Sequence, residues 1–447
     1  MQVCSTRDRG ARLSFSASLL AGLPPGGGLY QPDPVPDLRR EIAALPERAS
    51  FREVAAAMTA RLFAEELASS PAGPDAAARD VAEAAFPFAP ALSWLHDDLA
   101  LLELFHGPTC AFKDFGASFL ATLLERQLRT SPDGPGVVVL VATSGDTGGA
   151  VARAFWRRSG IEVVLLYPSG RISRLQEQQL TALGDNVHAL EVAGSFDDCQ
   201  RLVKAALADE ELAAAARLCP ANSISLGRLL PQAFYYLFAG VRLRSGGRPL
   251  FCVPSGNFGN LTAGVYAAWW GLPVAGFLAA TNRNDVVPRY LDTGELSPHP
   301  SFATLSNAMD VGDPSNFERI LARFEHDHAA VRDRLRGCSV SDADTLATMR
   351  DVHRHERRLV DPHTAVGIAA ARRLRASGGV DAGTPLVVLA TADAGKFPET
   401  VRRATGVEPP IPPSLQELLT RPKQATPMEP RSAALRAFIL ERATASG

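Results

Sequence analysis

The sequence predicts an α/β protein built on parallel sheets with helices on both faces. Continuous β-branched runs such as 137–141 are typical of strands that are buried on both faces of a parallel sheet. These runs alternate with segments of helical period, which indicates strand–helix–strand units. With 447 residues, 46% hydrophobic and 21% charged, the chain is long enough for two or three domains with sizeable cores.

The first 87 residues predict a mostly helical segment with no chemistry of its own. A short strand is expected near 12–17, and Pro- and Gly-rich punctuation at 24–28 and 32–36 interrupts the chain. Helical patterns follow at 51–68 and at 75–85.

From residue 88 the predicted strands and helices alternate. The apolar stripe of 114–129 has the period of a helix. The other expected helices are 147–158, 171–183, 197–215, 261–270, one from about 398 and one in the tail beyond 409. The expected strands are 137–141, 163–167, 187–192, 250–253, 274–278 and 386–390. We expect a large domain of residues 88–140 and 220–447, and a small domain of residues 141–219.

Composition excludes several classes of function. The net charge of −2 is dispersed, so we expect no nucleic-acid partner. No apolar run approaches the roughly 20 residues that span a bilayer, and the N-terminus predicts no signal peptide. Six scattered cysteines without a CxxC pair predict reduced thiols in a cytoplasmic protein. The i,i+2 histidine pairs do not have the spacing of a zinc helix, so we expect no metal site.

One lysine stands out by its rarity. Only four of the 46 basic residues are lysines: Lys113, Lys204, Lys396 and Lys423. A partly buried lysine can lose its proton and act as a nucleophile, whereas an arginine stays protonated. Lys113 follows a Gly-Pro turn and lies between two phenylalanines. Taken alone, that segment is equally compatible with a nucleophile and with a structural lysine that begins a helix and pairs with an acidic side chain.

Three loops at the carboxyl ends of predicted strands carry polar groups, and ligands bind at such ends in open α/β sheets. The loop at 143–149 offers hydroxyls and free N–H groups to an anion, although its aspartate at 146 repels phosphate. The same residues also fit an ordinary helix cap. The loop at 255–260 has two glycines and no acid, which favours phosphate over a plain turn.

The third loop, 391–396, ends at Lys396, which is a rival for the reactive lysine or a phosphate partner. A capped loop with an exposed lysine is the plain alternative. A nucleophilic lysine, a phosphate-binding loop and a parallel sheet together indicate pyridoxal phosphate as cofactor.

The chain resembles the threonine synthases of the longer bacterial and fungal type across nearly its whole length. The motifs that carry the resemblance are Glu103-Leu-Phe-His-Gly-Pro-Thr109, Ala111-Phe-Lys-Asp-Phe-Gly116, Ala142-Thr-Ser-Gly-Asp-Thr-Gly148, Asn222-Ser-Ile-Ser-Leu-Gly-Arg228, Val253-Pro-Ser-Gly-Asn-Phe-Gly259, Ala280-Thr-Asn-Arg-Asn-Asp285 and Thr304-Leu-Ser-Asn-Ala-Met-Asp310. The resemblance implies fold type II of the pyridoxal-phosphate enzymes, with the cofactor between a large and a small domain.

The resemblance also implies a role for individual residues. Lys113 would attach the cofactor and shuttle protons, Asp146 would lie on the ring side, and Thr391 would face the pyridine nitrogen. The other implied cofactor contacts are Phe112, Ser255, Gly256, Asn257, Phe258 and Gly259. The implied substrate contacts are Asn222 and Arg228, helped by Ser144 and Thr147. The implied reaction converts O-phospho-L-homoserine and water to L-threonine and phosphate, in a monomer or a homodimer.

Two places depart from the family's pattern. Asp393-Ala394-Gly395 stands where a histidine and a proline usually precede Ala-Lys-Phe, and Ser225 stands where asparagine is more usual. These departures keep an alternative open, in which a fold type II enzyme performs β-replacement or deamination on a hydroxy or phospho amino acid. A ligand-sensing relative without catalysis is a further hypothesis, although it predicts loss of the lysine or the phosphate loop, and both are present.

Overall fold

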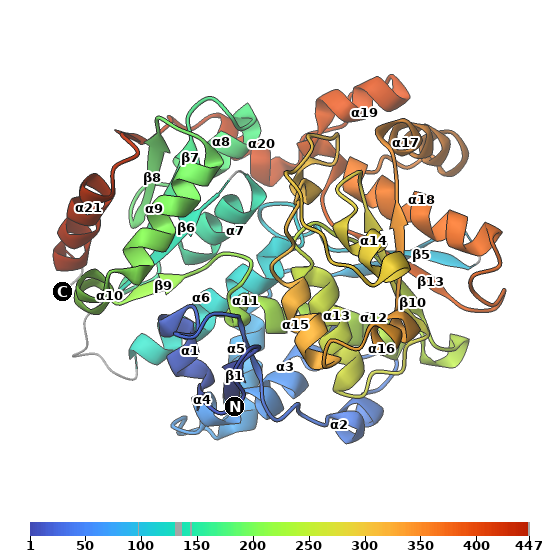
Figure 1. Ribbon diagram of the computed structural model, residues 1–447, viewed down its shortest axis with the longest axis horizontal. Helices are drawn as coiled ribbons and strands as arrows, with labels where there is room; N and C mark the ends of the chain where they lie inside the picture. Colours follow the sequence, from blue (N-terminus) through green and yellow to red (C-terminus); the bar gives the residue numbers. More distant parts are fainter. Residues whose placement is uncertain (97, 130–135, 144, 446–447) are drawn as a thin grey trace.

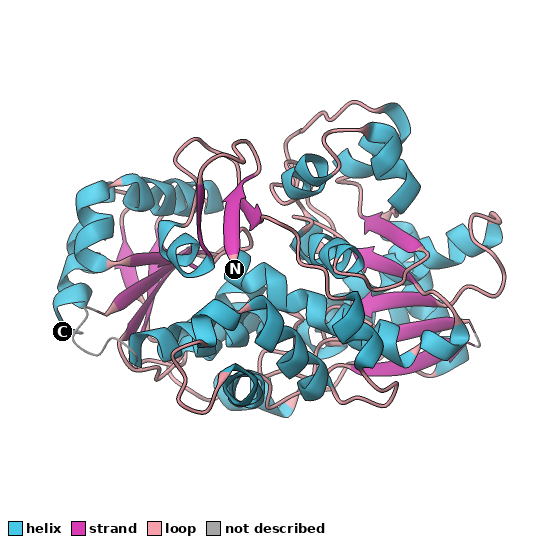
Figure 2. Cartoon of the chain, turned by 90° about the horizontal axis from the view of Figure 1, so that it is seen from below, coloured by secondary structure: helices cyan, strands magenta, loops and turns pink. Residues whose placement is uncertain are grey.

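The computed structural model describes residues 1–96, 98–129, 136–143 and 145–445, and it contains two separate sheets whose strands are mostly parallel (Figure 1). The sheets lie on opposite sides of the molecule, with helices between them (Figure 2). The predicted α/β class is therefore confirmed.

The larger sheet has six strands, and every neighbouring pair is parallel except the pair at one edge, which is antiparallel. Its order across the sheet is β12 (Leu335–Ser339), β11 (Gly276–Thr281), β10 (Leu250–Pro254), β13 (Leu386–Ala390), β5 (Leu99–Glu103) and β4 (Ala91–His96).

The smaller sheet has five parallel strands. Its order is β14 (Thr426–Met428), β8 (Val187–Val192), β7 (Ile161–Pro168), β6 (Val137–Ala142) and β9 (Leu218–Pro220). The predicted division gave 137–140 and 426–428 to the large domain, but β6 pairs with β7, and β14 pairs with β8. A buried β-branched run indicates a strand without indicating the sheet that the strand joins.

The N-terminal segment is mostly helical, as expected, but it begins with a three-stranded antiparallel sheet of order β2-β1-β3. Its strands are β1 (Gln2–Ser5), β2 (Arg12–Ser14) and β3 (Tyr30–Pro32). Its helices are α1 (Phe15–Ala21), α2 (Arg39–Ala44), α3 (Phe51–Leu62), α4 (Ala64–Leu67) and α5 (Pro74–Ala85). The expected strand near 12–17 ends at Ser14, because the Ser14 hydroxyl accepts the N–H of Ala17 and starts α1.

The remaining helices cover the two sheets and connect their strands. They are α6 (Lys113–Arg129), α7 (Asp146–Phe155), α8 (Arg174–Thr181), α9 (Phe196–Ala208), α10 (Glu210–Ala216), α11 (Leu226–Leu229), α12 (Ala233–Arg242), α13 (Gly259–Trp269), α14 (Val286–Thr293), α15 (Phe317–Arg323), α16 (His328–Arg334), α17 (Asp342–Glu356), α18 (Pro362–Ala376), α19 (Pro398–Thr405), α20 (Pro413–Leu419) and α21 (Ser432–Ala445). The helix expected at 197–215 is two helices, since Asp209 is extended and its side chain accepts the N–H of Leu212 at the start of the second.

Helix α6 is buried over most of its length, and the N-terminal helices pack against it. Phe115 and Phe119 are fully buried on α6. Phe51 of α3 makes an edge contact with Phe115 at 5.2 Å between ring centroids, and Phe63 lies 5.1 Å from Phe119. Burial of such rings stabilises the fold by about 1.5–3 kcal/mol each. The N-terminal segment therefore fixes the helix whose first residue is Lys113.

Candidate active site

The polar loops meet where strands of both sheets end. The segment before Lys113 follows β5, and the loops 255–258 and 391–396 follow β10 and β13 of the same sheet. From the other sheet come the loop after β6 and the segment 221–225 after β9. The carboxyl ends of parallel strands share one edge of a sheet, so each sheet presents its loops to the space between the two.

Lys113 is the first residue of α6, and hydrogen bonds hold the loop before it. The N–H of Phe112 donates to the carbonyl of Thr391 over 2.9 Å. The carboxylate of Asp114 accepts the N–H and the hydroxyl of Thr109 over 2.9 and 2.6 Å. Nζ of Lys113 lies 4.8 Å from the ring centroid of Phe112. The side chain retains 17% exposure, so its amine can reach a ligand.

The charges around Lys113 act in both directions. Burial lowers the pKa of Lys113, and the positive charges of Lys396 and Arg228 add to this effect. Asp146 opposes it, with Oδ2 at 3.8 Å from Nζ. The net direction favours the uncharged amine, which is the form that acts as a nucleophile.

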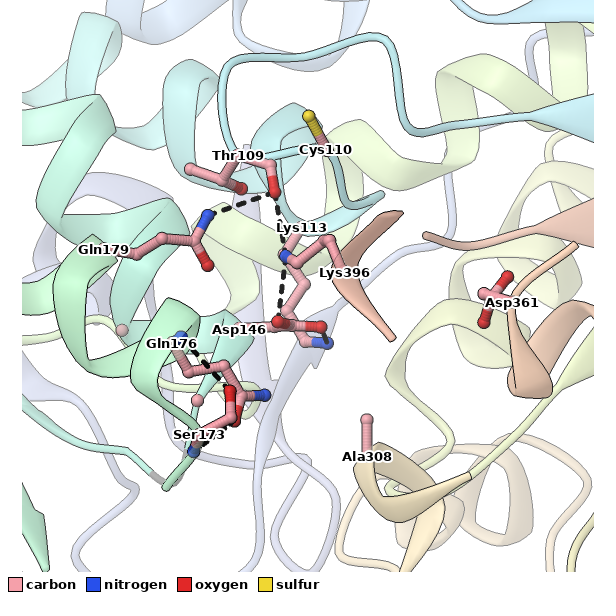
Figure 3. A network of polar contacts seen from close by, with 12 residues as sticks. Thr109, Cys110, Lys113, Asp146, Ser173, Gln176, Gln179, Ala308, Asp361 and Lys396 are labelled. Atoms are coloured by element: carbon pink, nitrogen blue, oxygen red, sulfur yellow. Dashed lines mark hydrogen bonds and ion pairs between the residues drawn. The ribbon is translucent and has the colours of Figure 1, made fainter. Parts of the chain in front are cut away.

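Lys396 is not the exposed lysine of the plain alternative, because its side chain is only 1% exposed. Figure 3 shows its ammonium between Asp146 and Thr109. Nζ lies 2.9 Å from Oδ1 of Asp146 and donates to the carbonyl of Thr109 over 2.8 Å. The charge of Lys396 and its hydrogen bond to the carboxylate both lower the pKa of Asp146.

Asp146 occupies the first turn of α7 and is buried. Burial alone would raise its pKa, but Lys396 and Lys113 lower it below the usual range of a carboxyl group. The cap predicted for this loop comes from Thr143, whose hydroxyl oxygen accepts the N–H of Gly148 over 2.9 Å. Thr147 follows Asp146 on the same turn, and Ser144 lies outside the described residues.

The loop 255–258 leaves the start of α13 open to an anion. Phe258 has φ 61°, a left-handed conformation that turns the chain into the helix. Within the described part of the chain, no side chain caps α13, so its first N–H groups have no such partner. A Cβ on Gly256 would lie 2.7 Å from Cα of Met309, which shows that the segment 306–309 closes over this loop.

A contact that the sequence did not predict holds that closing segment. The N–H of Ala308 donates to Nε2 of His363 over 3.1 Å, and Nδ1 of His363 donates to Oδ1 of Asp361 over 2.8 Å. Asp361 is fully buried and caps α18. The Asp-Pro pair at the start of that helix is a recognisable cap signal, but its link to Ala308 spans 55 residues.

Arg228 and Asn222, the predicted substrate contacts, lie in the segment after β9. Arg228 is 3% exposed and donates from Nη1 to the carbonyl of Ala221 over 2.8 Å, while its Nε has no partner among the described residues. Burial lowers its pKa to about 10. Oδ1 of Asn222 is also buried without a described partner. The side chain of Asn257 donates to the hydroxyl of Ser223 over 2.6 Å and joins this segment to the loop 255–258.

A cavity of about 520 Å³ opens beside these loops. Ser173 and Gln176 at the start of α8 line it from the smaller sheet, and Thr304, Asn307 and Lys396 line it from the larger one. The two sheets therefore form the two walls of the cleft.

The residues of the site fit pyridoxal phosphate. The uncapped start of α13 could take a phosphate, because the loop 255–260 carries no acid, and Lys113 supplies a partly exposed amine of lowered pKa. Thr391, which directly follows β13 and is buried, offers a neutral hydroxyl for a ring nitrogen. Oδ1 of Asn257 is a buried acceptor without a described partner.

Known proteins resemble this chain over its whole length. Residues 89–392 match the model of the pyridoxal-phosphate-dependent enzymes, and residues 2–71 and 364–439 match the N-terminal and C-terminal models of threonine synthase. The threonine synthase of Serratia marcescens is 40% identical and covers 93% of both chains. That of Escherichia coli K12 is 38% identical and covers 98% of this chain and 99% of its own. The structure of the pyridoxal-phosphate-bound threonine synthase of Brucella melitensis has a TM-score of 0.90, 35% identity and 99% coverage of both chains.

Proposed function

We propose that the chain, which belongs to the threonine synthase family of pyridoxal-phosphate-dependent enzymes, converts O-phospho-L-homoserine and water to L-threonine and phosphate. The observation that carries the proposal is the pairing of a partly exposed lysine of lowered pKa with an uncapped helix start, both of which follow strands of the same six-stranded sheet. These relatives favour this activity over β-replacement or deamination.

Each cofactor-binding group has a position that suits its task. The first N–H groups of α13 and the backbone of Ser255, Gly256 and Asn257 would hold the cofactor phosphate. Lys113 would attach the cofactor through Nζ, and Thr391 would meet the ring nitrogen with a hydroxyl. When bound, pyridoxal phosphate withdraws electrons from the substrate's α-carbon and acidifies the hydrogen there.

Lys113 is also the group that we assign to proton transfer. Its Nζ can take the proton from the α-carbon and then from the β-carbon. After the γ-phosphate has left, it can return one proton to the γ-carbon, which becomes the methyl group of threonine, and another to the α-carbon once water has added at the β-carbon. One amine can serve these steps because its pKa is lowered toward the working pH. Loss of the γ-phosphate and addition of water together account for the products.

Arg228 and Asn222 would hold the phosphate of the substrate, with Ser144 and Thr147 assisting. The unpartnered Nε of Arg228 is a buried cationic donor, and such a donor costs free energy until an anion pairs with it. The guanidinium fork bonds phosphate oxygens in pairs, which a lysine cannot do. Burial of this arginine therefore supports an anionic substrate group.

The test combines an assay with identification of the lysine. The purified full-length chain should release threonine and phosphate from O-phospho-L-homoserine, and borohydride reduction should add the cofactor's mass to the peptide that contains Lys113. The variant Lys113→Ala should lose both signals, whereas Lys204→Ala, which changes an exposed lysine on α9, should keep both. Bound cofactor without release of threonine would contradict the proposal.

Three further predictions belong to this proposal. We propose a large domain on the six-stranded sheet and a small domain on the five-stranded sheet, in a monomer or a homodimer. We also propose a cytoplasmic location, which the six free cysteines support. Separately, none of the helices in the described ranges is long and apolar enough to cross a membrane.

A further inference from the structure

Lys396 is the charged group of the site to which the proposed chemistry gives no task. Its side chain is almost completely buried, and burial of an ammonium group is costly unless an anion pairs with it. It lies on the 3-10 turn Ala394–Lys396, directly after the strand whose end meets the Lys113 loop. Its place in the site therefore requires an explanation.

Two lysines lie beside one carboxylate. Asp146 has Nζ of Lys396 at 2.9 Å from Oδ1 and Nζ of Lys113 at 3.8 Å from Oδ2 (Figure 3). Lys396 gains a second oxygen from the carbonyl of Thr109 at 2.8 Å. Gln179 donates to the same carbonyl over 3.3 Å, so this oxygen is held in place. The contacts favour Lys396 as the lysine that carries the positive charge.

The other charges near Lys113 do not offer it a better partner. Asp114 is turned toward Thr109, and burial raises its pKa to about 6. Arg228 adds a further positive charge to the surroundings of Lys113. The ring of His363 has its own carboxylate partner, since Nδ1 donates to Oδ1 of Asp361 over 2.8 Å. Among the described acids, Asp146 is the one that lies within ion-pair distance of both lysines.

We propose that Lys396 is a positioning residue whose ammonium pairs with the carboxylate of Asp146. Because that carboxylate is already paired, Lys113 stays uncharged and free to attach the cofactor. Lys396 acts through Asp146 and not by contact with the reacting atoms. The inference rests on the proposed function in one respect, namely that Lys113 is the attached lysine. If Lys396 only joined two loops, its loss would change stability and leave the ionisation of Lys113 as it was.

The test measures the rate of cofactor attachment against pH. Pyridoxal phosphate is added to the full-length chain from which cofactor has been removed, and the visible absorbance of the lysine adduct is followed from pH 6 to pH 10. In Lys396→Met the carboxylate of Asp146 is left to Lys113, so the midpoint of the rate profile should rise by about one unit or more. Attachment near pH 7.5 should slow by about tenfold or more. Lys396→Arg, which keeps the charge, should stay close to the unchanged chain, as should Lys204→Met.

The outcomes separate the two hypotheses. A midpoint that is the same in Lys396→Met and the unchanged chain would overturn the positioning role, even if the melting temperature falls. Cofactor mass on the peptide of Lys396 instead of Lys113, after borohydride reduction, would overturn it together with the lysine assignment of the proposed function. Mass on Lys113 with an unchanged profile would overturn the inference alone.

A measurement on the unchanged chain covers the case in which Lys396→Met does not fold. The cofactor-free chain is treated with limiting acetic anhydride from pH 6 to pH 10, and the acetylated fraction of each lysine is read by mass spectrometry. Acetylation requires the free amine, so the fraction for Lys113 should reach half its maximum at a lower pH than the fraction for the exposed Lys204. An equal or higher midpoint for Lys113 would overturn the proposal.

Discussion

Gly256 offers a direct test of the proposed phosphate site. In Gly256→Ala the new Cβ would lie 2.7 Å from Cα of Met309 and 3.0 Å from the carbonyl oxygen of Ala308. Carbon atoms in contact prefer about 3.5 Å or more, so the loop or the segment 306–309 must move by about 0.8 Å. Both obstacles are backbone atoms, and the contact of Ala308 with His363 resists the movement.

The expected cost has two parts. Overpacking of this kind destabilises a fold by about 1–3 kcal/mol. Displacement of the loop also misaligns N–H groups that would bind the cofactor phosphate, and one hydrogen bond to a charged group contributes about 1.5–3 kcal/mol. Loss of one such bond weakens cofactor binding by roughly 10- to 100-fold.

The assay is titration of the cofactor-free chain with pyridoxal phosphate, followed by absorbance, beside a thermal melt. Gly383→Ala is the matched control, since a Cβ there meets no described atom within 4 Å. The reasoning would be refuted if Gly256→Ala bound the cofactor as tightly as the control and melted at the same temperature. Weaker binding with an unchanged melt would assign the whole cost to the phosphate site.

Two other changes should separate the roles of neighbouring residues. Arg228→Met should raise the KM for O-phospho-L-homoserine by about tenfold or more, because at least one charged hydrogen bond to the substrate is lost. The absorbance of the bound cofactor should not change. An unchanged KM would show that Arg228 does not bind the substrate. Asp114 has a pKa of about 6 in the fold against 3.8 as its ordinary value, so the stability that its protonated form contributes is present below about pH 4 and is lost as the pH rises through 6. The stability of the unchanged chain should therefore fall relative to Asp114→Asn by up to about 3 kcal/mol between pH 4 and pH 7. A difference in melting temperature between the two proteins that stays constant across this range would contradict the expected loss of stability.

Local pattern was sufficient for much of the fold. The β-branched run at 137–141 and the apolar stripe at 114–129 correspond to β6 and α6. A strand buried on both faces leaves a continuous apolar run in the sequence, and a helix buried along one stripe leaves apolar residues at the helical period. The pair β4 and β5, which leads to Lys113, was missed. Its residues do not form a continuous β-branched run, and β4 lies at the edge of its sheet. Helices α17 and α18 were also missed.

The candidate site was predictable loop by loop but not as an arrangement. Each of the loops at 143–149, 255–260 and 391–396 was recognisable from its glycines, hydroxyls and charges. That Lys396 would pair with Asp146 depends on how two sheets face each other, and no local pattern records this. The same holds for the link between His363 and Ala308, in which both partners look ordinary in sequence.

The strand β14 determines when the smaller sheet is completed during synthesis of the chain. The chain builds β6 to β9, then completes the larger sheet with β10 to β13, and returns to the smaller sheet only at Thr426–Met428. While the ribosome is still making the residues before β14, β8 is an edge strand whose unpaired N–H and C=O groups can pair with another chain. The smaller wall of the cleft is therefore begun before the larger sheet is complete and is closed after it, and the nascent protein depends on Thr426–Met428 to cover that edge.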